Sequence, residues 1–493
     1  MKSTRSSQPR AATAVPPDES RQPAGGWKLY VLASAALLVP CFWQTRLQAG
    51  DLGSHIYNAW LAELIRQGRA PGLSIVPQTT NVLFDLLLSG LFRTVGSAAA
   101  QRIAVSLAVL VFVWGAFAFV AAAARREWAM LPVIAMLAYG WVFHMGFFNF
   151  YLSLGLCFWA LALAWNPAPR RLLAAAPILL AAYVAHGLPV AWACAVLGFL
   201  WLARRLPAKR GQLIVTAVLA ICALHVAMSA TMMTRWTYWQ IQRVAGVDQA
   251  WVYDDKYWIA SAGLLLVWSA LWASAIRRGG ARRWFGGELF LVFALTAAGV
   301  FLLPSWAWLP GYHHALVFIS ERMSLPIGVL VAALAATASP RRWQRWAIGV
   351  LAAVFFLFLY VDEGALNAYE HQIRDRLAQL PPMARVVSNT DADLRINALT
   401  HIIDRECIGR CYSYANYEPS SGQFRIRVTG PTSIVAATDM DSSRMQNGGY
   451  AVKEGDLPLY RISVAPDGSL AVDSMPAGSL IGVSRWNGLW GLP

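Results

Sequence analysis

Runs of apolar residues separated by short polar connections dominate the chain from residue 29 to residue 361. A run of about 20 apolar residues is long enough to cross the hydrocarbon core of a membrane as a helix. Eleven such runs are predicted, several of them shorter than that length, over residues 29–43, 103–124, 128–145, 147–165, 172–187, 189–203, 211–230, 258–276, 286–303, 323–338 and 346–361. The pattern predicts an all-α polytopic membrane domain over residues 27–361.

The two flanks of this region have a different pattern. Residues 1–26 are rich in Ser, Pro, Gln and Arg without apolar periodicity, which predicts a disordered tail. Polar and apolar residues alternate over 423–428 and 459–464, which is typical of strands, and 465–469 (Ala-Pro-Asp-Gly-Ser) predicts a hairpin turn. Residues 362–493 are therefore expected to form a small α+β domain.

Composition agrees with a membrane protein. Of the 493 residues, 57% are hydrophobic and only 14% are charged, against roughly 25% charged residues in ordinary globular domains. This balance excludes a large water-soluble enzyme and a disordered scaffold. The net charge of +15 comes from basic clusters between apolar runs, which is an orientation signal rather than a nucleic-acid-binding surface.

The basic clusters predict the orientation of the helices. They fall at every second connection, at Arg125–Arg126, Arg170–Arg171, 204–210, 277–283 and 341–345, and such connections face the cytoplasm. The N-terminus and the tail of residues 1–26 are then cytoplasmic, and the C-terminal domain is extracytoplasmic. Residues 45–100 form a first outer loop only if the segment 81–96 is an amphipathic or re-entrant helix. The composition and the lack of organelle targeting signals favour a bacterial inner membrane.

The cysteines are informative at one place. Cys407 and Cys411 lie in a polar stretch with the spacing of a small disulfide loop, and disulfides form outside the cytosol. Zinc is the alternative, but it needs two further ligands, and only His401 is near in the sequence. The other four cysteines lie in apolar runs, as small buried hydrophobic residues do.

Polar side chains concentrate in the predicted outer connections and the C-terminal domain. Seven of the eight histidines lie there or at the helix ends beside them. The candidates are Asp51, His55, Asn58, Glu63, His144, Asn149, His186, Arg235, Asp254, Asp255, His313, His314, Glu321 and Arg322. The predicted cytoplasmic connections show no comparable set, which favours a functional site at the outer interface.

Asp51 is the leading candidate, because a partly desolvated carboxylate at an interface can act as a general base or orient a metal ion. The alternative is that Asp51 caps a helix beginning near Ser54. Asp254 and Asp255 are candidate ligands of a divalent cation, with a solvated acidic turn as the alternative. Arg322 suits a lipid phosphate, because its guanidinium makes bidentate contacts; its alternative is an anchor paired with Glu321.

The layout around these residues resembles the GT-C class of membrane glycosyltransferases, such as protein O-mannosyltransferases, aminoarabinose transferases and bacterial oligosaccharyltransferases. One helix is followed by a long outer loop that opens with an acid, Asp51, then by many spans and an outer C-terminal domain. The resemblance covers the whole chain through its layout. It departs from many members, which have two adjacent acids here, because Leu52 follows Asp51.

The resemblance implies transfer of a sugar from a polyprenyl-phosphate donor to a lipid, glycan or protein acceptor at the outer face. It implies Asp51 as the catalytic acid, and His55 is the neighbouring candidate for the chemistry. Arg322, with His313, His314 and Arg235, is expected to bind the donor phosphate. A second carboxylate is left open among Glu63, Asp85 and the Asp254–Asp255 pair, and with it the need for a divalent cation.

Two other classes of function compete with this reading. A transporter is disfavoured, because the middle of the predicted spans is nearly free of ionisable residues. A membrane scaffold or sensor would act through its outer domain, where residues 411–425 are dense in the Tyr, Asn, Gln and Arg side chains that bind sugars or peptides.

Overall fold

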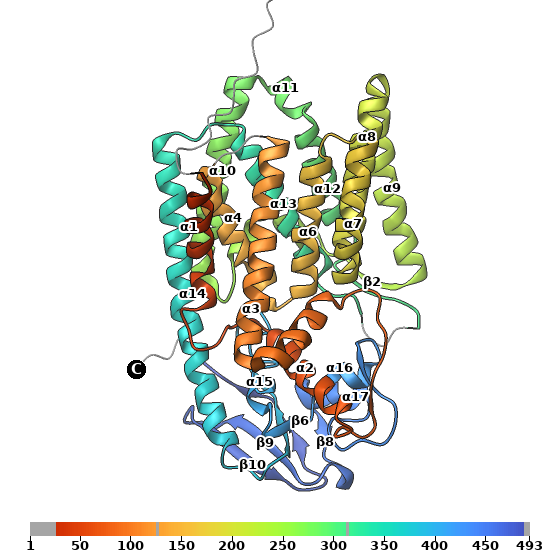
Figure 1. The fold of residues 1–493 in the computed structure, drawn as a ribbon, viewed down its shortest axis with the longest axis vertical. Helices are drawn as coiled ribbons and strands as arrows, with labels where there is room; N and C mark the ends of the chain where they lie inside the picture. The colour runs from red at the N-terminus through yellow and green to blue at the C-terminus, as the bar shows by residue number, and fades with distance from the viewer. Residues whose placement is uncertain (1–25, 125–127, 312–314, 488–493) are drawn as a thin grey trace, which may run out of the picture.

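The structure, a computed structural model, describes residues 26–124, 128–311 and 315–487. Apolar helices form a bundle, and a smaller region that contains strands lies against one end of it (Figure 1). Residues 1–25 of the predicted tail and the Arg125–Arg126 cluster lie outside the described residues.

Each of the eleven apolar runs contains helix. The bundle consists of α1 (Gly26–Leu38), α3 (Leu83–Ala123), α4 (Leu131–Ala138), α5 (Trp141–Met145), α6 (Phe148–Ala164), α7 (Pro169–Ala185), α8 (Gly187–Arg205), α9 (Arg210–Thr231), α10 (Trp258–Gly279), α11 (Ala281–Phe285), α12 (Glu288–Leu302), α13 (Ile319–Ala336) and α14 (Arg342–Leu377). Within the described residues, seven helical stretches are long and apolar enough to cross a membrane. The segments 26–41, 148–164 and 288–302 are apolar but shorter, so the count of eleven spans stays a prediction.

Two predicted boundaries differ from the structure, and a third agrees with it in part. The 81–96 segment is the first part of α3, and the non-helical Gly96 (φ 77°) separates it by a kink from the helix that follows. The run 128–145 breaks around Gly140 into η2 (Trp128–Met130), α4 and α5. Helix α14 does not end near residue 361 but continues to Leu377, because apolar residues at helical spacing, from Leu366 onward, stay buried against the strand-containing region.

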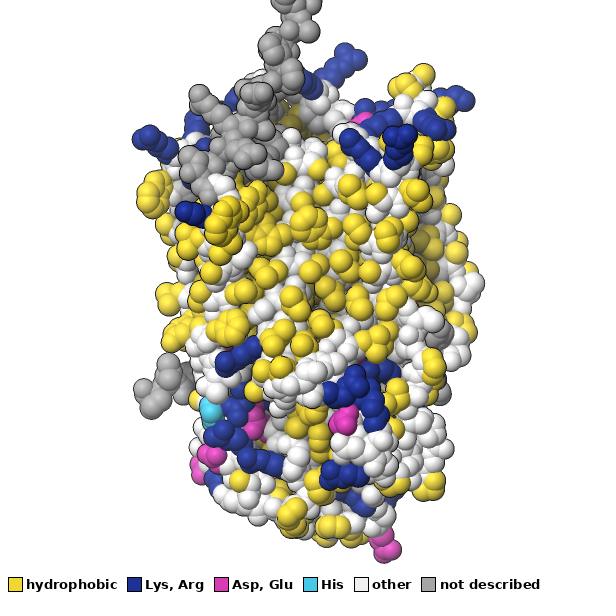
Figure 2. Space-filling view, viewed as in Figure 1, with side chains coloured by type: hydrophobic (Ala, Val, Ile, Leu, Met, Phe, Trp, Pro, Cys, Tyr) yellow, Lys and Arg dark blue, Asp and Glu magenta, His cyan; other side chains and the backbone are white. Residues whose placement is uncertain are grey.

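The helices run alternately between two ends of the bundle (Figure 1). Basic side chains gather at the end opposite the strands (Figure 2). We call it the basic end; its residues are Arg170, Arg171, Arg204, Arg205, Lys209, Arg210, Arg277, Arg278, Arg282, Arg283, Arg341, Arg342 and Arg345. We call the opposite end, which carries the strands, the strand end.

Burial differs sharply between helices. Helix α13 is buried along most of its length, whereas α9, which the structure describes in full, has no buried residue. Its side chains are nevertheless apolar; Leu219 is 62% and Val226 is 64% exposed. An apolar helix with this exposure is stable only where the surrounding solvent is itself apolar, which fits a membrane protein.

The strand end contains a four-stranded sheet in the order β10-β9-β4-β6. Strand β4 (Ala384–Ser388) lies parallel to both β6 (Cys411–Ser413) and β9 (Leu459–Val464). Strand β10 (Leu470–Met475) returns from β9 through the turn at 465–469. The predicted strand at 459–464 and its hairpin are thereby confirmed, and β7 (Ile426–Val428) lies within the predicted strand 423–428.

Shorter elements complete this end of the molecule. The strands are β1 (Leu73–Ile75), β2 (Met233–Arg235), β3 (Trp306–Trp308), β5 (Thr390–Asp391), β8 (Tyr450–Ala451), β11 (Leu480–Ile481) and β12 (Ser484–Arg485). The helices are α2 (Leu52–Arg66), α15 (Asp404–Cys407), α16 (Tyr417–Ser421) and α17 (Asp439–Asn447), together with 3-10 turns at 39–41, 238–243, 247–250, 255–257 and 454–456. A further 3-10 turn, at 207–209, joins α8 to α9 at the basic end.

The connection between α1 and α3 packs against the C-terminal region. Strand β1 pairs antiparallel with β7, more than 350 residues later. On α2, the Tyr57 hydroxyl accepts a hydrogen bond from the Ser413 amide at 3.0 Å. A Cβ added at Gly53 would stand 2.3 Å from the His401 carbonyl oxygen. Helix α2 therefore lies directly on the C-terminal region.

We predict that Gly53→Ala loosens this contact. The added methyl group meets backbone, which cannot turn away, so we expect a loss of about 1–3 kcal/mol in stability and a lower thermal unfolding midpoint in detergent. Gly90→Ala is the matched control, because a Cβ at Gly90 in α3 meets no atom within 4 Å and alanine favours the helix. Equal midpoints for the two variants would contradict the close contact.

Candidate functional site

Asp51 is held by its backbone at the junction of the bundle and the strand end. Its amide donates to the Met145 carbonyl at 3.1 Å, and the preceding Gly50 amide donates to the His144 carbonyl at 2.7 Å. Gly146 turns the chain there with a φ of 85°, and a Cβ on it would lie 2.4 Å from the Asp51 nitrogen. The turn between α5 and α6 thus fixes where Asp51 sits.

The carboxylate of Asp51 is not used as a helix cap. Helix α2 begins at Leu52, one residue after Asp51, and Asp51 makes no side-chain capping bond. Its side chain is 26% exposed. Asp51 therefore occupies the N-cap position of α2, as the capping alternative predicts, but its carboxylate makes no capping hydrogen bond and is left available at a partly enclosed surface.

A histidine from the C-terminal region faces Asp51. The His401 Nε2 atom lies 4.0 Å from an Asp51 oxygen, and its Nδ1 atom lies 2.9 Å from Asp404. Asp404 also accepts a hydrogen bond from the Ser413 hydroxyl at 2.5 Å. Burial opposes the charge on His401, but the hydrogen bond and charge of Asp404 outweigh it and raise the pKa of His401. The imidazole is thereby oriented toward Asp51.

Arg322 brings a cation to the same place from the first turn of α13. Its guanidinium carbon lies 3.7 Å from the centre of the Phe147 ring, a cation–π contact. Phe147 directly follows Gly146, the residue that packs against the Asp51 nitrogen. Its Nε atom is buried and has no hydrogen-bond partner among the described residues.

Arg322 is not the partner of its neighbour Glu321. Glu321 instead accepts a hydrogen bond from Arg243 at 2.7 Å. The anchor alternative, in which Arg322 pairs with Glu321, is therefore wrong. Its buried, unpartnered Nε leaves the guanidinium a donor for an anionic oxygen.

His55 forms an ion pair beside this site. Its Nδ1 atom lies 2.6 Å from Asp85, and Asn149 donates to the other Asp85 oxygen at 2.7 Å. Burial opposes the charge on His55, but the attraction and hydrogen bond of Asp85 raise the pKa of His55 to about 9. Of the carboxylates considered as a second acid, Asp85 is the one that pairs with His55, whose amide donates to the Asp51 carbonyl at 3.0 Å.

Helix α16 adds two side chains. Burial, and then the charges of Asp51 and Glu418, raise the pKa of Tyr417 well above its usual value, so its phenol stays neutral. The Tyr417 ring lies 5.6 Å from that of His401. Glu418 accepts a hydrogen bond from Ser54 at 2.7 Å, and burial raises the pKa of Glu418 to about 7.

Other predicted residues support the site without facing Asp51. His144 is buried, with Nδ1 3.0 Å from the Gln48 carbonyl oxygen, and it steadies the loop before Asp51. Asn58 accepts a hydrogen bond from Asn416 at 2.9 Å and ties α2 to the C-terminal region. His186 caps α8; burial, and then the charge of Arg322, lower the pKa of His186 to about 3.

Four further candidates lie elsewhere. Glu63 pairs with Arg66 on the surface of α2. Arg235 is exposed and stacks on Trp306. Asp254 is tied to Lys256 at 2.9 Å, and Asp255 is exposed. His313 and His314 lie outside the described residues.

Metal ligation has limited support in this part of the chain. Within residues 26–124, 128–311 and 315–487, no group of three or more His, Cys, Asp and Glu side chains is arranged to hold an ion. Cys407 and Cys411 form a disulfide, and His401 is engaged by Asp404. Among the described residues, Asp51 is left as the carboxylate of this site that makes no side-chain hydrogen bond.

An apolar groove lies between three helices of the bundle. It has a volume of about 390 Å³ and is lined by α1, α4 and α14, with Pro40, Trp43 and Tyr139 among its residues. Aromatic contacts lead from Tyr139 through Phe143 and Phe148 to Phe84, which packs against His55. Phe143, Phe148 and Phe84 are buried and do not line the groove, so these ring contacts connect Tyr139 at the groove to His55 through the core.

Comparison of the chain with family models, with curated proteins and with solved structures finds no match.

Sequence reasoning missed His401, Asp404, Tyr417 and Glu418 as members of this site. Residues 411–425 are dense in polar and aromatic side chains, which is the signal in the sequence for the last two. From the sequence, His401 is a candidate only as a zinc ligand beside Cys407. Its closeness to Asp51 depends on the contact of α2 with the C-terminal region.

The His55–Asp85 pair predicts a pH dependence of stability. Because the pKa of His55 rises from 6.5 to about 9 on folding, the pair stabilises fully below the lower value and loses its contribution as the pH rises through the higher one. We expect the unfolding midpoint of wild type to exceed that of His55→Gln near pH 6 and to approach it above about pH 9. A difference that does not change with pH would contradict this.

Proposed function

We propose that the chain is a membrane glycosyltransferase of the GT-C type, a hexosyl- or pentosyltransferase. It transfers a sugar from a polyprenyl-phosphate donor to an acceptor lipid, glycan or protein at the strand end of the bundle. The observation that carries the proposal is that the Asp51 carboxylate, which makes no helix-capping hydrogen bond, and the Arg322 guanidinium, whose buried Nε has no partner among the described residues, both lie where the apolar helices end.

Asp51 is proposed as the general base. Attack on the anomeric carbon requires removal of a proton from the acceptor hydroxyl, and a partly exposed carboxylate within reach of that hydroxyl can accept it. The His401 imidazole, held by Asp404, orients the carboxylate from one side. A divalent cation bound to Asp51 stays an alternative role, in which the carboxylate orients the ion.

Arg322 is proposed to bind the donor phosphate. The leaving phosphate gains negative charge as the glycosidic bond breaks, and a guanidinium stabilises that charge with paired hydrogen bonds. Phe147 holds the guanidinium from one face, which leaves its edge for the phosphate. The neutral phenol of Tyr417 lies in the same charged neighbourhood and suits a sugar hydroxyl.

The arrangement of the bundle fits a lipid-linked donor. Asp362 lies about 30 Å along α14 from Arg342, at about 1.5 Å a residue, which is the thickness of a hydrocarbon core. The ionisable side chains of α14 from Asp362 onward are therefore at the strand end rather than at mid-membrane. We propose that the basic end is cytoplasmic, that the strand end is extracytoplasmic in a bacterial inner membrane, and that the apolar groove holds part of the polyprenyl chain.

We predict that Asp51→Asn abolishes transfer. The assay supplies purified protein with radiolabelled polyprenyl-phosphate sugars and membrane extract as acceptor, with and without EDTA. Loss of the base is expected to lower the rate about a hundredfold or more, with donor binding and the unfolding midpoint preserved.

Asp473→Asn is the matched control, because Asp473 is an exposed carboxylate on β10. Transfer by Asp51→Asn at the control rate would reject Asp51 as the base. Loss of transfer in EDTA, restored by added Mg²⁺ or Mn²⁺, would assign Asp51 the metal-orienting role instead.

We predict a different signature for Arg322→Gln. Removing a charge-assisted hydrogen bond to the phosphate lowers kcat/KM for the donor by about ten- to a hundredfold, and Arg322→Lys recovers part of it because the charge returns without the planar fork. Phosphate binding by Arg322 would be excluded if neither Arg322→Gln nor Arg322→Lys changed kcat or the KM for the donor and both variants affected folding equally.

A further inference from the structure

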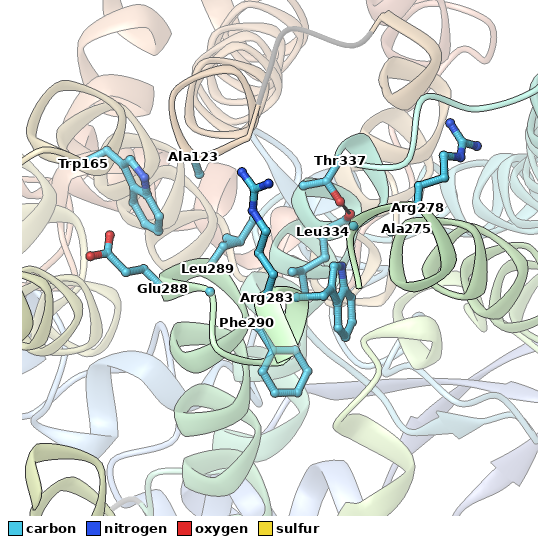
Figure 3. A pocket seen from close by; sticks show the side chains of 13 residues that line it. Ala123, Trp165, Ala275, Arg278, Arg283, Glu288, Leu289, Phe290, Leu334 and Thr337 are labelled. Atoms are coloured by element: carbon cyan, nitrogen blue, oxygen red, sulfur yellow. Dashed lines mark hydrogen bonds between the residues drawn. The ribbon is translucent and has the colours of Figure 1, made fainter. Parts of the chain in front are cut away.

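A second candidate site lies at the basic end, far from Asp51. A cavity of about 620 Å³ opens there between the ends of α3, α10 and α13, the start of α12, and the short helix α11. Figure 3 shows its lining, with Arg283 near the middle and Arg278 at one side. The volume lies within the range of small-molecule sites, about 300–1,000 Å³.

Two cations in this cavity lack an anionic partner. Among the described residues, neither Arg278 nor Arg283 makes an ion pair; Arg278 makes one long hydrogen bond, 3.5 Å, to the Ser339 carbonyl. The carboxylate in the lining, Glu288, is already neutralised by Arg204, which donates to both of its oxygens at 3.0 and 3.1 Å. The cavity therefore carries two positive charges that no described carboxylate pairs, both on side chains that are exposed to solvent.

A buried donor in the same lining also lacks an acceptor. The Nε1 atom of Trp284 is buried and has no hydrogen-bond partner among the residues that the structure describes. Buried N–H groups in proteins are nearly always paired. Two guanidinium groups and an indole N–H together offer donors to a ligand with several anionic oxygens, and none of them offers an acceptor.

The rest of the lining is apolar. Leu289, Phe290 and Leu334 line the cavity, and Phe290 packs on Trp284 with ring centres 5.0 Å apart. An inorganic anion would leave this apolar surface uncovered, whereas an amphiphile covers it with hydrocarbon. The lining thus selects a molecule that joins an anionic oxygen group to an apolar chain.

We propose that this cavity binds the phosphate headgroup of an anionic phospholipid from the membrane leaflet at the basic end. Arg278 and Arg283 hold the phosphate oxygens, Trp284 donates to an oxygen, and Leu289, Phe290 and Leu334 contact the upper part of the acyl chains. The site is independent of the proposed transfer reaction, because it shares no residue with the Asp51 site.

The test is lipid retention by the full chain, measured by native mass spectrometry after detergent purification and addition of phosphatidylglycerol. The variant is Arg278→Gln/Arg283→Gln. Its matched control is Arg277→Gln/Arg282→Gln, which removes the same charge from the same two helices at exposed positions outside the cavity. We expect the cavity variant to lower the affinity for phosphatidylglycerol at least tenfold and the control to leave it within about twofold.

Further variants and lipids distinguish binding in the cavity from a general effect of surface charge. Trp284→Phe keeps the ring and removes the N–H, so it should weaken binding several-fold, while Arg278→Lys/Arg283→Lys should keep part of it. Zwitterionic phosphatidylcholine should bind at least tenfold more weakly than phosphatidylglycerol to wild type. Unfolding midpoints of all variants, measured without added lipid, should equal that of wild type.

Three results would overturn the proposal. Equal losses in the cavity variant and its control would show a non-specific charge effect. Retention unchanged in the cavity variant would show that lipid binds elsewhere. Retention of polyprenyl phosphate or inorganic phosphate in preference to phosphatidylglycerol would assign the cavity to a different phosphate source.

Discussion

The candidate site depends on two close backbone contacts beside Asp51. Gly146 lets the turn between α5 and α6 come against the Asp51 nitrogen, and Gly53 lets α2 lie on the His401 carbonyl. The first joins the start of α2 to the bundle, and the second joins it to the C-terminal region. With both in place, a bundle residue, Arg322, and a C-terminal residue, His401, come to the same carboxylate.

Local pattern was enough to locate the helices and two strands. The apolar runs are long, and the alternation at 459–464 is regular, so each element could be read from its own residues. Boundaries failed where tertiary contact prolonged an element: α14 continues past residue 361 because Leu366 and Ile373 find a buried surface on the strand-containing region. A short stretch of sequence cannot reveal this surface, because residues far along the chain form it.

The site was predictable only in part, for a similar reason. Asp51, His55 and Arg322 stand out as polar residues beside apolar runs, and the structure brings them together. His401 and Tyr417 lie some 350 residues beyond Asp51, in a region where polar residues are ordinary. Only the pairing of β1 with β7 and the seating of α2 make them neighbours. Asp254 shows the opposite case. It is adjacent to Asp255 in the sequence, which suggests a cation site, but in the fold it pairs with Lys256.

In the proposed sugar transfer, Asp51 is the base and His401 acts only by orienting its carboxylate. A double-mutant cycle on kcat/KM, with Asp51→Asn, His401→Gln and the combined variant in the radiolabelled-donor assay, tests it most directly. If His401 acts through Asp51, the combined variant should be no slower than Asp51→Asn alone. Independent effects that multiply in the combined variant would contradict the account.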